Sequence, residues 1–120
     1  MTEARLSLGR LGEDAAAKYL QRLGMTILQR NVHTPVGEID LVARQRRILI
    51  FVEVKTRRSS AFGSHAEAVG LRKQRQIIRA AKWYLNDKSG KTMQPRFDVV
   101  SVLINGSDEA IEHIPGAFEA

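Results

Sequence analysis

The stretch GEIDLVARQRRILIFVEVKTRR, which runs from Gly37 to Arg58, determines the fold of this 120-residue chain. It contains two mainly aliphatic and β-branched runs, EIDLVA and ILIFVEVK, separated by the polar tetrapeptide RQRR. This pattern predicts two antiparallel strands joined by a short turn. Strands normally bury apolar side chains, so Asp40, Glu53 and Lys55, which interrupt the two runs, require a separate explanation.

The alternation of side chains along a strand decides which of these charged groups can meet. Glu53 and Lys55 are two residues apart and therefore share one face of their strand. If RQRR forms the whole connection, Asp40 lies opposite Phe51 and diagonal to Glu53, about 7–8 Å away on the same face. A shift of one residue would move Asp40 and Glu53 to opposite faces. The prediction of a shared site therefore depends on the register.

A divalent metal ion would explain why two carboxylates share a face. Like charges repel each other and are costly to remove from water, and a cation relieves both effects. Oxygen ligands with open coordination positions suit Mg²⁺ or Mn²⁺. Lys55 would add a positive charge that orients an attacking water or stabilises a phosphate transition state. The alternative is a cross-strand salt bridge on a solvated face, with Lys55 paired to Asp40 or Glu53.

The rest of the sequence predicts an α/β fold with a mixed sheet of about five strands flanked by helices. Helices are expected over residues 8–23 and 70–86, and strands over residues 25–31, 38–43, 48–55, 96–104 and 110–114. Short connections at both ends favour antiparallel hairpins, whereas the long second helix allows one crossover. A chain of this length is expected to form one domain over residues 1–120.

Composition limits the classes of function. The net charge of +6 and the pI near 10.2 suit a polyanionic partner such as nucleic acid, although many small proteins are simply basic. The chain has no cysteine, which excludes disulfides and thiolate metal sites. No apolar run approaches the roughly 20 residues that cross a bilayer, and the N-terminus lacks an apolar signal core. A cytoplasmic protein without a membrane partner is expected.

The second helix carries a stripe of basic residues. Their spacing of three, four and three residues places them on one side of the helix at about 100° per residue. The stripe consists of Arg72, Arg75, Arg79 and Lys82. Lys73 projects elsewhere near the helix start, and Trp83, between the apolar and basic faces, is interpreted as a packing residue. A phosphate backbone would relieve the repulsion within the stripe, and the alternative is a solvated helix face.

Further basic residues follow the second strand of the hairpin. Arg57 and Arg58 come directly after Lys55, and together with the stripe and Lys73 they form the expected nucleic-acid contacts. Phe62, in the loop that follows, is either a base-stacking residue or a core anchor.

The two hairpin motifs resemble a known nuclease core. GEIDLVA followed by ILIFVEVKTR is similar to the Asp…Glu-x-Lys core of the PD-(D/E)xK nuclease superfamily. More narrowly, the chain resembles the YraN-type bacterial family, regarded as endonucleases. That resemblance covers nearly the whole chain, because it includes GEDAAAKYLQRLGMTILQRN near the start, RFDVVSV and the ending IEHIPGAF. It implies a restriction-endonuclease-like core that hydrolyses phosphodiester bonds with Mg²⁺ or Mn²⁺.

The resemblance also assigns roles to individual residues. It implies that Asp40 and Glu53 are metal ligands, that the peptide carbonyl of Val54 is a further ligand, and that Lys55 is the catalytic lysine. Glu13 matches the acidic residue that archaeal Holliday-junction resolvases carry on the first helix. The alternative for Glu13 is a carboxylate on the helix surface near the positive helix end.

The resemblance implies DNA as the partner, with branched repair or recombination intermediates as substrates and a homodimer as one assembly. Two departures from the family pattern, Val32-His33 and Gly70-Leu71, lie outside the acidic core and weaken only the inference about nucleic-acid contacts. The alternatives are a nucleic-acid-binding module without catalysis and a protein-interaction adaptor with the same fold.

Overall fold

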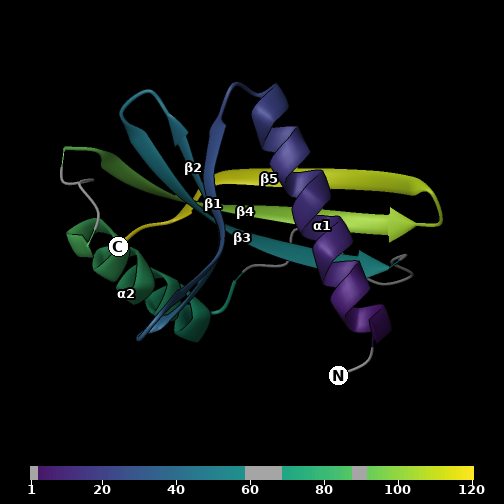
Figure 1. The fold of residues 1–120 in the computed structure, drawn as a ribbon, viewed down its shortest axis with the longest axis horizontal. Helices are drawn as coiled ribbons and strands as arrows, with labels where there is room; N and C mark the ends of the chain where they lie inside the picture. Colours follow the sequence, from purple (N-terminus) through teal and green to yellow (C-terminus); the bar gives the residue numbers. More distant parts are fainter. Residues whose placement is uncertain (1–2, 59–68, 88–91) are drawn as a thin grey trace.

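The computed structural model describes residues 3–58, 69–87 and 92–120, which form two helices and a five-stranded sheet. In chain order the elements are α1 (Glu3–Arg22), β1 (Thr26–Thr34), β2 (Gly37–Gln45), β3 (Ile48–Arg58), α2 (Leu71–Asp87), β4 (Gln94–Asn105) and β5 (Asp108–Phe118). The strands lie side by side in sequence order, and helix α1 crosses one face while α2 covers the other (Figure 1). The predicted α/β fold is confirmed, and it is consistent with a restriction-endonuclease-like core.

The mixed character of the sheet comes from one connection. Strands β3 and β4 are parallel, and the remaining neighbours are antiparallel. Parallel neighbours require a crossover, which α2 provides, whereas two-residue turns join β1 to β2 and β4 to β5. This arrangement places β3, the strand that carries Glu53 and Lys55, at the centre of the sheet. No helix within the described ranges is long and apolar enough to cross a bilayer.

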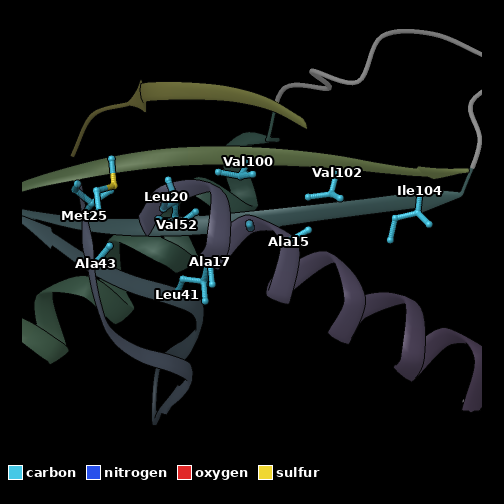
Figure 2. Close-up of a cluster of buried hydrophobic side chains, with 12 residues drawn as sticks. Ala15, Ala17, Leu20, Met25, Leu41, Ala43, Val52, Val100, Val102 and Ile104 are labelled. Carbon is cyan, nitrogen blue, oxygen red and sulfur yellow. The ribbon is translucent and has the colours of Figure 1, made fainter. Parts of the chain in front are cut away.

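The core consists of one apolar layer on each face of the sheet. On the α1 side, small residues of the helix pack against aliphatic residues of β2, β3 and β4 (Figure 2). Ala16 and Leu20 are fully buried there, and Ala15 and Ala17 are nearly so. On the α2 side, Phe51 is fully buried and stacks on Phe97. The alanines bring α1 close to the strands, and this closeness positions Glu13.

The hairpin register differs from the predicted one. Gln45 pairs with Ile48 and Leu41 pairs with Val52, so only Arg46 and Arg47 form the turn instead of the whole RQRR. Arg46 adopts a left-handed conformation with φ 57°. The predicted pairing of Asp40 with Phe51 was therefore wrong by two residues, because two-residue turns match the strand twist best. A shift of two residues preserves side-chain parity, so Asp40 and Glu53 stay on the same face.

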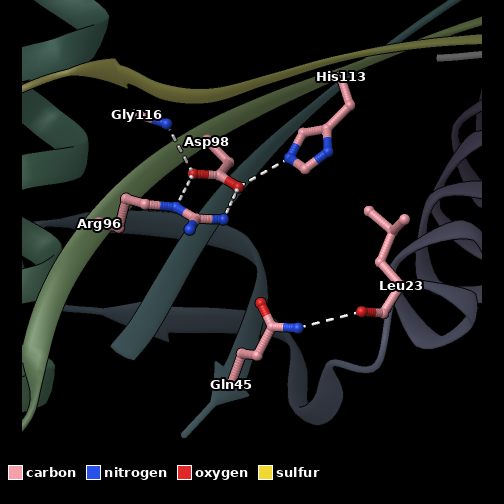
Figure 3. A network of polar contacts seen from close by, with 6 residues as sticks. All are labelled: Leu23, Gln45, Arg96, Asp98, His113 and Gly116. Carbon is pink, nitrogen blue, oxygen red and sulfur yellow. Dashed lines mark hydrogen bonds and ion pairs between the residues drawn. The ribbon is translucent and has the colours of Figure 1, made fainter. Parts of the chain in front are cut away.

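A buried ionic network connects β4 to β5. Asp98 is fully buried, and its carboxylate accepts hydrogen bonds from Arg96 at 2.8 Å and from the backbone N–H of Gly116 at 3.0 Å (Figure 3). His113 Nε2 lies 2.7 Å from the same carboxylate. The network spans an irregularity in the β4–β5 pairing, next to Asp98 between Phe97 and Val99. Burial alone would raise the pKa of Asp98, but these hydrogen bonds outweigh it and hold the pKa at about 2.

The network predicts a specific loss of stability in acid. A depressed pKa contributes stability above the unfolded value of 3.8, and this contribution is lost as the pH falls towards about 2. We expect Asp98→Asn to lower the free energy of unfolding by about 2 kcal/mol at neutral pH, because the neutral amide binds Arg96 less strongly. Urea unfolding at neutral pH and near pH 3 measures this, and a deficit that persists unchanged in acid would contradict it.

The close approach of α1 to β3 gives a second prediction, on a matched pair of glycines. A Cβ added at Gly12 would lie 2.7 Å from Thr56 Cβ, whereas a Cβ at Gly9 would meet nothing within 4 Å. Both residues lie inside α1, so alanine gains the same helix propensity at each position. Gly9→Ala is expected to stabilise the protein by up to about 1 kcal/mol. Gly12→Ala is expected to destabilise it by about 1–3 kcal/mol, because rotation of Thr56 cannot move its Cβ.

Thermal unfolding of the two variants followed by circular dichroism measures the difference. Equal melting temperatures for Gly9→Ala and Gly12→Ala would show that α1 can move away from β3 at little cost.

Candidate functional site

Asp40 ends the pairing between β2 and β3. The hydrogen-bonded register stops at Leu41 and Val52, although both strands continue beyond these residues. The Oδ2 atom of Asp40 instead accepts a hydrogen bond of 2.8 Å from the backbone N–H of Val54. The side-chain carboxylate of Asp40 thus accepts the hydrogen bond of the Val54 amide, which lies between Glu53 and Lys55 in the chain. This bond fixes Asp40 against the part of β3 that carries the other two charged residues.

Glu53 is the next residue to face Asp40 beyond the last pair. Its side chain is only 14% exposed, and a hydrogen bond links its carboxyl group to that of Asp40. Lys73, on the first turn of α2, places its Nζ atom 3.8 Å from Glu53 Oε2. Lys55 also acts electrostatically on Glu53. One lysine of β3 and one of α2 therefore act on the carboxyl pair.

The surroundings of Glu53 strongly favour its protonated form. Burial is the largest cause, and the charge of Asp40 and the hydrogen bond to Asp40 add to it. Lys73 and Lys55 oppose the effect without cancelling it, and the pKa of Glu53 rises to about 8. A further positive charge bound beside Glu53 would lower this pKa and favour the ionised carboxylate.

Glu13 is a third carboxylate beside this pair. Its side chain, 18% exposed, lies near the position where Gly12 packs against Thr56 of β3. Burial raises the pKa of Glu13, as does the charge of Asp40, while a hydrogen bond from Asn31 and the charge of Arg30 lower it. Arg30 NH2 lies 4.0 Å from Glu13 and 2.6 Å from Asp14. Glu13 thus faces the sheet and interacts electrostatically with Asp40.

The β1–β2 hairpin twists at the level of this site, so that residues two positions apart pack on opposite faces of the sheet. Leu41 packs on the α1 side, yet Ile39, two residues away, packs on the α2 side. In β1, Arg30 reaches α1 whereas Val32 packs on the α2 side. Asn31 lies between them with φ 52°, a left-handed conformation that Asn tolerates better than most residues. Asn31 was not identified from the sequence as part of the site. The only property of its residue type that indicates such a position is this tolerance of a left-handed conformation.

The donor set suits a hard divalent cation, since the carboxylates and the Val54 carbonyl are oxygen ligands. Within residues 3–58, 69–87 and 92–120, however, no group of three or more His, Asp or Glu side chains lies close enough together to hold a metal ion. The structure therefore brings Asp40 and Glu53 into hydrogen-bonding contact and brings Glu13 within electrostatic range of Asp40. A closed three-residue cage is not formed by the described residues.

The basic residues divide into groups with different positions. The predicted stripe on α2 is exposed, and it consists of Arg72, Arg75, Arg79 and Lys82. Lys73 is separate from the stripe, because its side chain reaches Glu53. Arg57 and Arg58 lie at the end of β3, beyond Lys55. Phe62 lies outside the described residues.

The arginines of the β2–β3 turn are far from the acidic residues. Arg47 precedes Glu53 by six residues, which is about 20 Å along an extended strand. The turn arginines are therefore separated from the acidic residues along β3.

The fold and the arrangement of carboxylates define the class of protein: an α/β domain with a five-stranded mixed sheet, consistent with a restriction-endonuclease-like core, and a pair of interacting carboxyl groups beside its central strand. Residues 12–102 match the model of an uncharacterised protein family, UPF0102. The chain belongs to the UPF0102 family, which confirms the YraN-type resemblance at the level of the family.

Relatives from diverse bacteria match over nearly their whole length. A UPF0102 protein of Syntrophotalea carbinolica is 60% identical over 99% of this chain and 97% of its own. Similar proteins of Rhodococcus jostii and Caldanaerobacter subterraneus are 47% and 42% identical, over 94% and 93% of this chain and 97% and 94% of their own. These comparisons establish the family and leave its activity to be inferred from the site.

The raised pKa of Glu53 predicts how the stability of the metal-free protein changes with pH. The folded state holds this proton more tightly than the unfolded chain, so the contribution is fully present below 4.5 and is lost as the pH rises through about 8. We expect Glu53→Gln, which imitates the protonated form, to flatten this decline. Melting temperatures in EDTA across this range measure it, at about 4 °C per kcal/mol. An unchanged slope in Glu53→Gln would assign the titration to another group.

Proposed function

We propose that this protein is a Mg²⁺- or Mn²⁺-dependent nuclease that hydrolyses phosphodiester bonds in DNA. The observation that supports this function best is the partly buried, hydrogen-bonded pair of Asp40 and Glu53, with Lys55 two residues further along the same strand. Burial of two interacting carboxyl groups is costly, and perturbed pKa values of this kind are typical of functional sites.

Asp40, Glu53 and the carbonyl of Val54 would hold the metal ion, with Glu13 on the α1 side completing the acidic group. When bound, the ion supplies a positive charge that polarises the phosphate and lowers the pKa of a water molecule. The hydrogen bond from the Val54 N–H holds Asp40 in place for this role. Because Glu53 has a pKa of about 8, it must lose its proton before it can act as an oxygen ligand.

The two lysines have separate roles in this proposal. Lys55, on the strand beside the acidic pair, orients the attacking water or stabilises the charge that develops on the phosphate. Lys73 already pairs with Glu53 at 3.8 Å and lies at the start of α2, from which the basic stripe continues. Lys73 therefore connects the acidic site to the surface that is proposed to bind the phosphate backbone.

The exposed α2 stripe would bind the backbone of DNA away from the cleaved bond. Four cations along one helix face repel each other, and phosphates relieve this repulsion with release of counterions. Arg57 and Arg58, at the end of β3, would extend the contact beyond Lys55. Binding of this kind is insensitive to sequence and strongly dependent on salt.

A cleavage assay tests the proposal. The protein is incubated with linear, nicked, flapped and branched DNA and with matching RNA, in Mg²⁺, in Mn²⁺ and in EDTA. We expect metal-dependent cleavage of DNA, reduced about 10²–10³-fold by Asp40→Asn, Glu53→Gln or Lys55→Met, because each change removes a group that stabilises charge in the transition state. Glu38→Gln is the matched control, since Glu38 is an exposed carboxylate on the same strand and pairs with His33.

Cleavage by Asp40→Asn at the wild-type rate would overturn the proposal, as would the absence of any cut nucleic acid. Calorimetric titration of Mn²⁺ into wild type and Asp40→Asn tests metal binding separately from phosphodiester cleavage, because it measures binding without catalysis.

The second candidate is a nucleic-acid-binding module without catalysis. The contact between Lys73 and Glu53 favours it, because an ammonium group already neutralises part of the acidic site. This module would bind DNA equally well in EDTA and after Glu53→Gln, with a strong salt dependence and no cleavage. The same assays therefore distinguish the two functions.

A further inference from the structure

A polar hollow lies between the edge strand β1 and the second half of α2. Its volume is about 260 Å³, and it is lined by residues 29–33 of β1 together with Trp83 and Tyr84 of α2. This volume lies just below the range of about 300–1,000 Å³ for small-molecule sites, so the hollow suits a single planar group rather than a large ligand. We propose that it receives one unpaired nucleobase of the nucleic-acid substrate, stacked on Trp83. This inference rests on the proposed function and specifies a substrate with a single-stranded segment beside the cleaved bond.

Trp83 is the residue on which the base would stack. It is 37% exposed, whereas its neighbour Tyr84 is buried at 6%. The interpretation of Trp83 as a packing residue is therefore only partly right, since Tyr84 makes the core contact with Phe51. An exposed indole at the edge of a hollow offers a face for stacking, which contributes about 1–3 kcal/mol per base in single-strand binding proteins.

The opposite wall of the hollow provides hydrogen-bonding groups. Gln29, Asn31 and His33 line this wall, and amides and imidazoles can both donate and accept hydrogen bonds. Asn31 also bonds to Glu13, and His33 Nδ1 lies 3.0 Å from Glu38 Oε1. β1 is an edge strand, so one side of its backbone is not used in the sheet. A wall of this composition suits the polar edge of a base better than an aliphatic ligand.

The hollow is connected to both parts of the proposed nuclease surface. Asn31 lines it and also donates the hydrogen bond to Glu13, so the hollow and the acidic site meet at this residue. Arg79 precedes Trp83 by one helical turn, and Lys82 is its neighbour along the chain. Phosphates bound along the stripe would therefore lead a strand towards Trp83. These contacts favour a nucleotide over an uncharged ligand as the occupant.

Fluorescence provides a specific test, because Trp83 is the only tryptophan of the chain. In EDTA, which prevents cleavage, the protein is titrated with a DNA hairpin that carries a short single-stranded tail. The same hairpin with an abasic tail matches its phosphates and lacks its bases, and a blunt hairpin lacks the tail. We expect quenching by the base-containing tail and much weaker quenching by the other two.

Binding of the tailed hairpin to variants is measured by anisotropy of a labelled strand. We expect Trp83→Ala to weaken binding about 5- to 150-fold, which is the stacking contribution expressed as a ratio, and Trp83→Phe to retain most of the affinity. Leu71→Ala is the matched control on the same helix, since Leu71 is 66% exposed and lies outside the hollow. Circular dichroism of each variant confirms that it is folded.

Equal quenching by the base-containing and abasic tails would overturn the inference, as would unchanged affinity in Trp83→Ala. These outcomes differ from failure of the proposed function, which the cleavage assay measures separately. A protein that cuts blunt and tailed DNA alike with wild-type and Trp83→Ala rates is a nuclease without this base site.

Discussion

The hydrogen bond from the Val54 amide to the Asp40 carboxylate is the interaction on which the site depends. It replaces a backbone pair between β2 and β3, and so the two central strands stop pairing at Leu41 and Val52. A strand pair that continued would bury its apolar side chains, whereas here the chain places Asp40 beside Glu53. At this point the fold gives up backbone hydrogen bonds between β2 and β3, and a pair of interacting carboxyl groups takes their place. Placing these two carboxyl groups side by side is costly, and the positive charges of Lys73 and Lys55 offset part of the cost.

The sequence predicted the elements of this site better than their geometry. Alternation together with the assumed RQRR turn placed Asp40, Glu53 and Lys55 on one face, and this placement survived a register error of two residues because side-chain parity repeats every two residues. The turn was the weak point, since RQRR contains no glycine, asparagine or proline that would indicate which residues form it. The left-handed conformation of Arg46 is imposed by the strands on either side rather than indicated by its residue type.

Long-range contacts explain what the sequence did not predict. Lys73 and Glu53 are twenty residues apart, and the crossover through α2 brings them together. Asn31 has an evident function only after the twist of the β1–β2 hairpin is known, because it forms the hydrogen bond to Glu13 where the hairpin changes faces. The Asp98 network likewise depends on a bulge between β4 and β5. No local periodicity indicates contacts of this kind.

Charged groups from helices on both faces of the sheet act on the acidic site. Glu13 comes from α1, which Gly12 allows to approach Thr56 closely, and Lys73 comes from α2 on the opposite face. Glu13 and Lys73 act on the carboxyl pair through their side chains, so the position of each charged group depends on how its helix packs on the sheet. A substitution that moves α1 would therefore change the field at Asp40 through Glu13 while leaving the Val54 hydrogen bond intact. The packing of small residues in α1 is for this reason part of the site as well as part of the core.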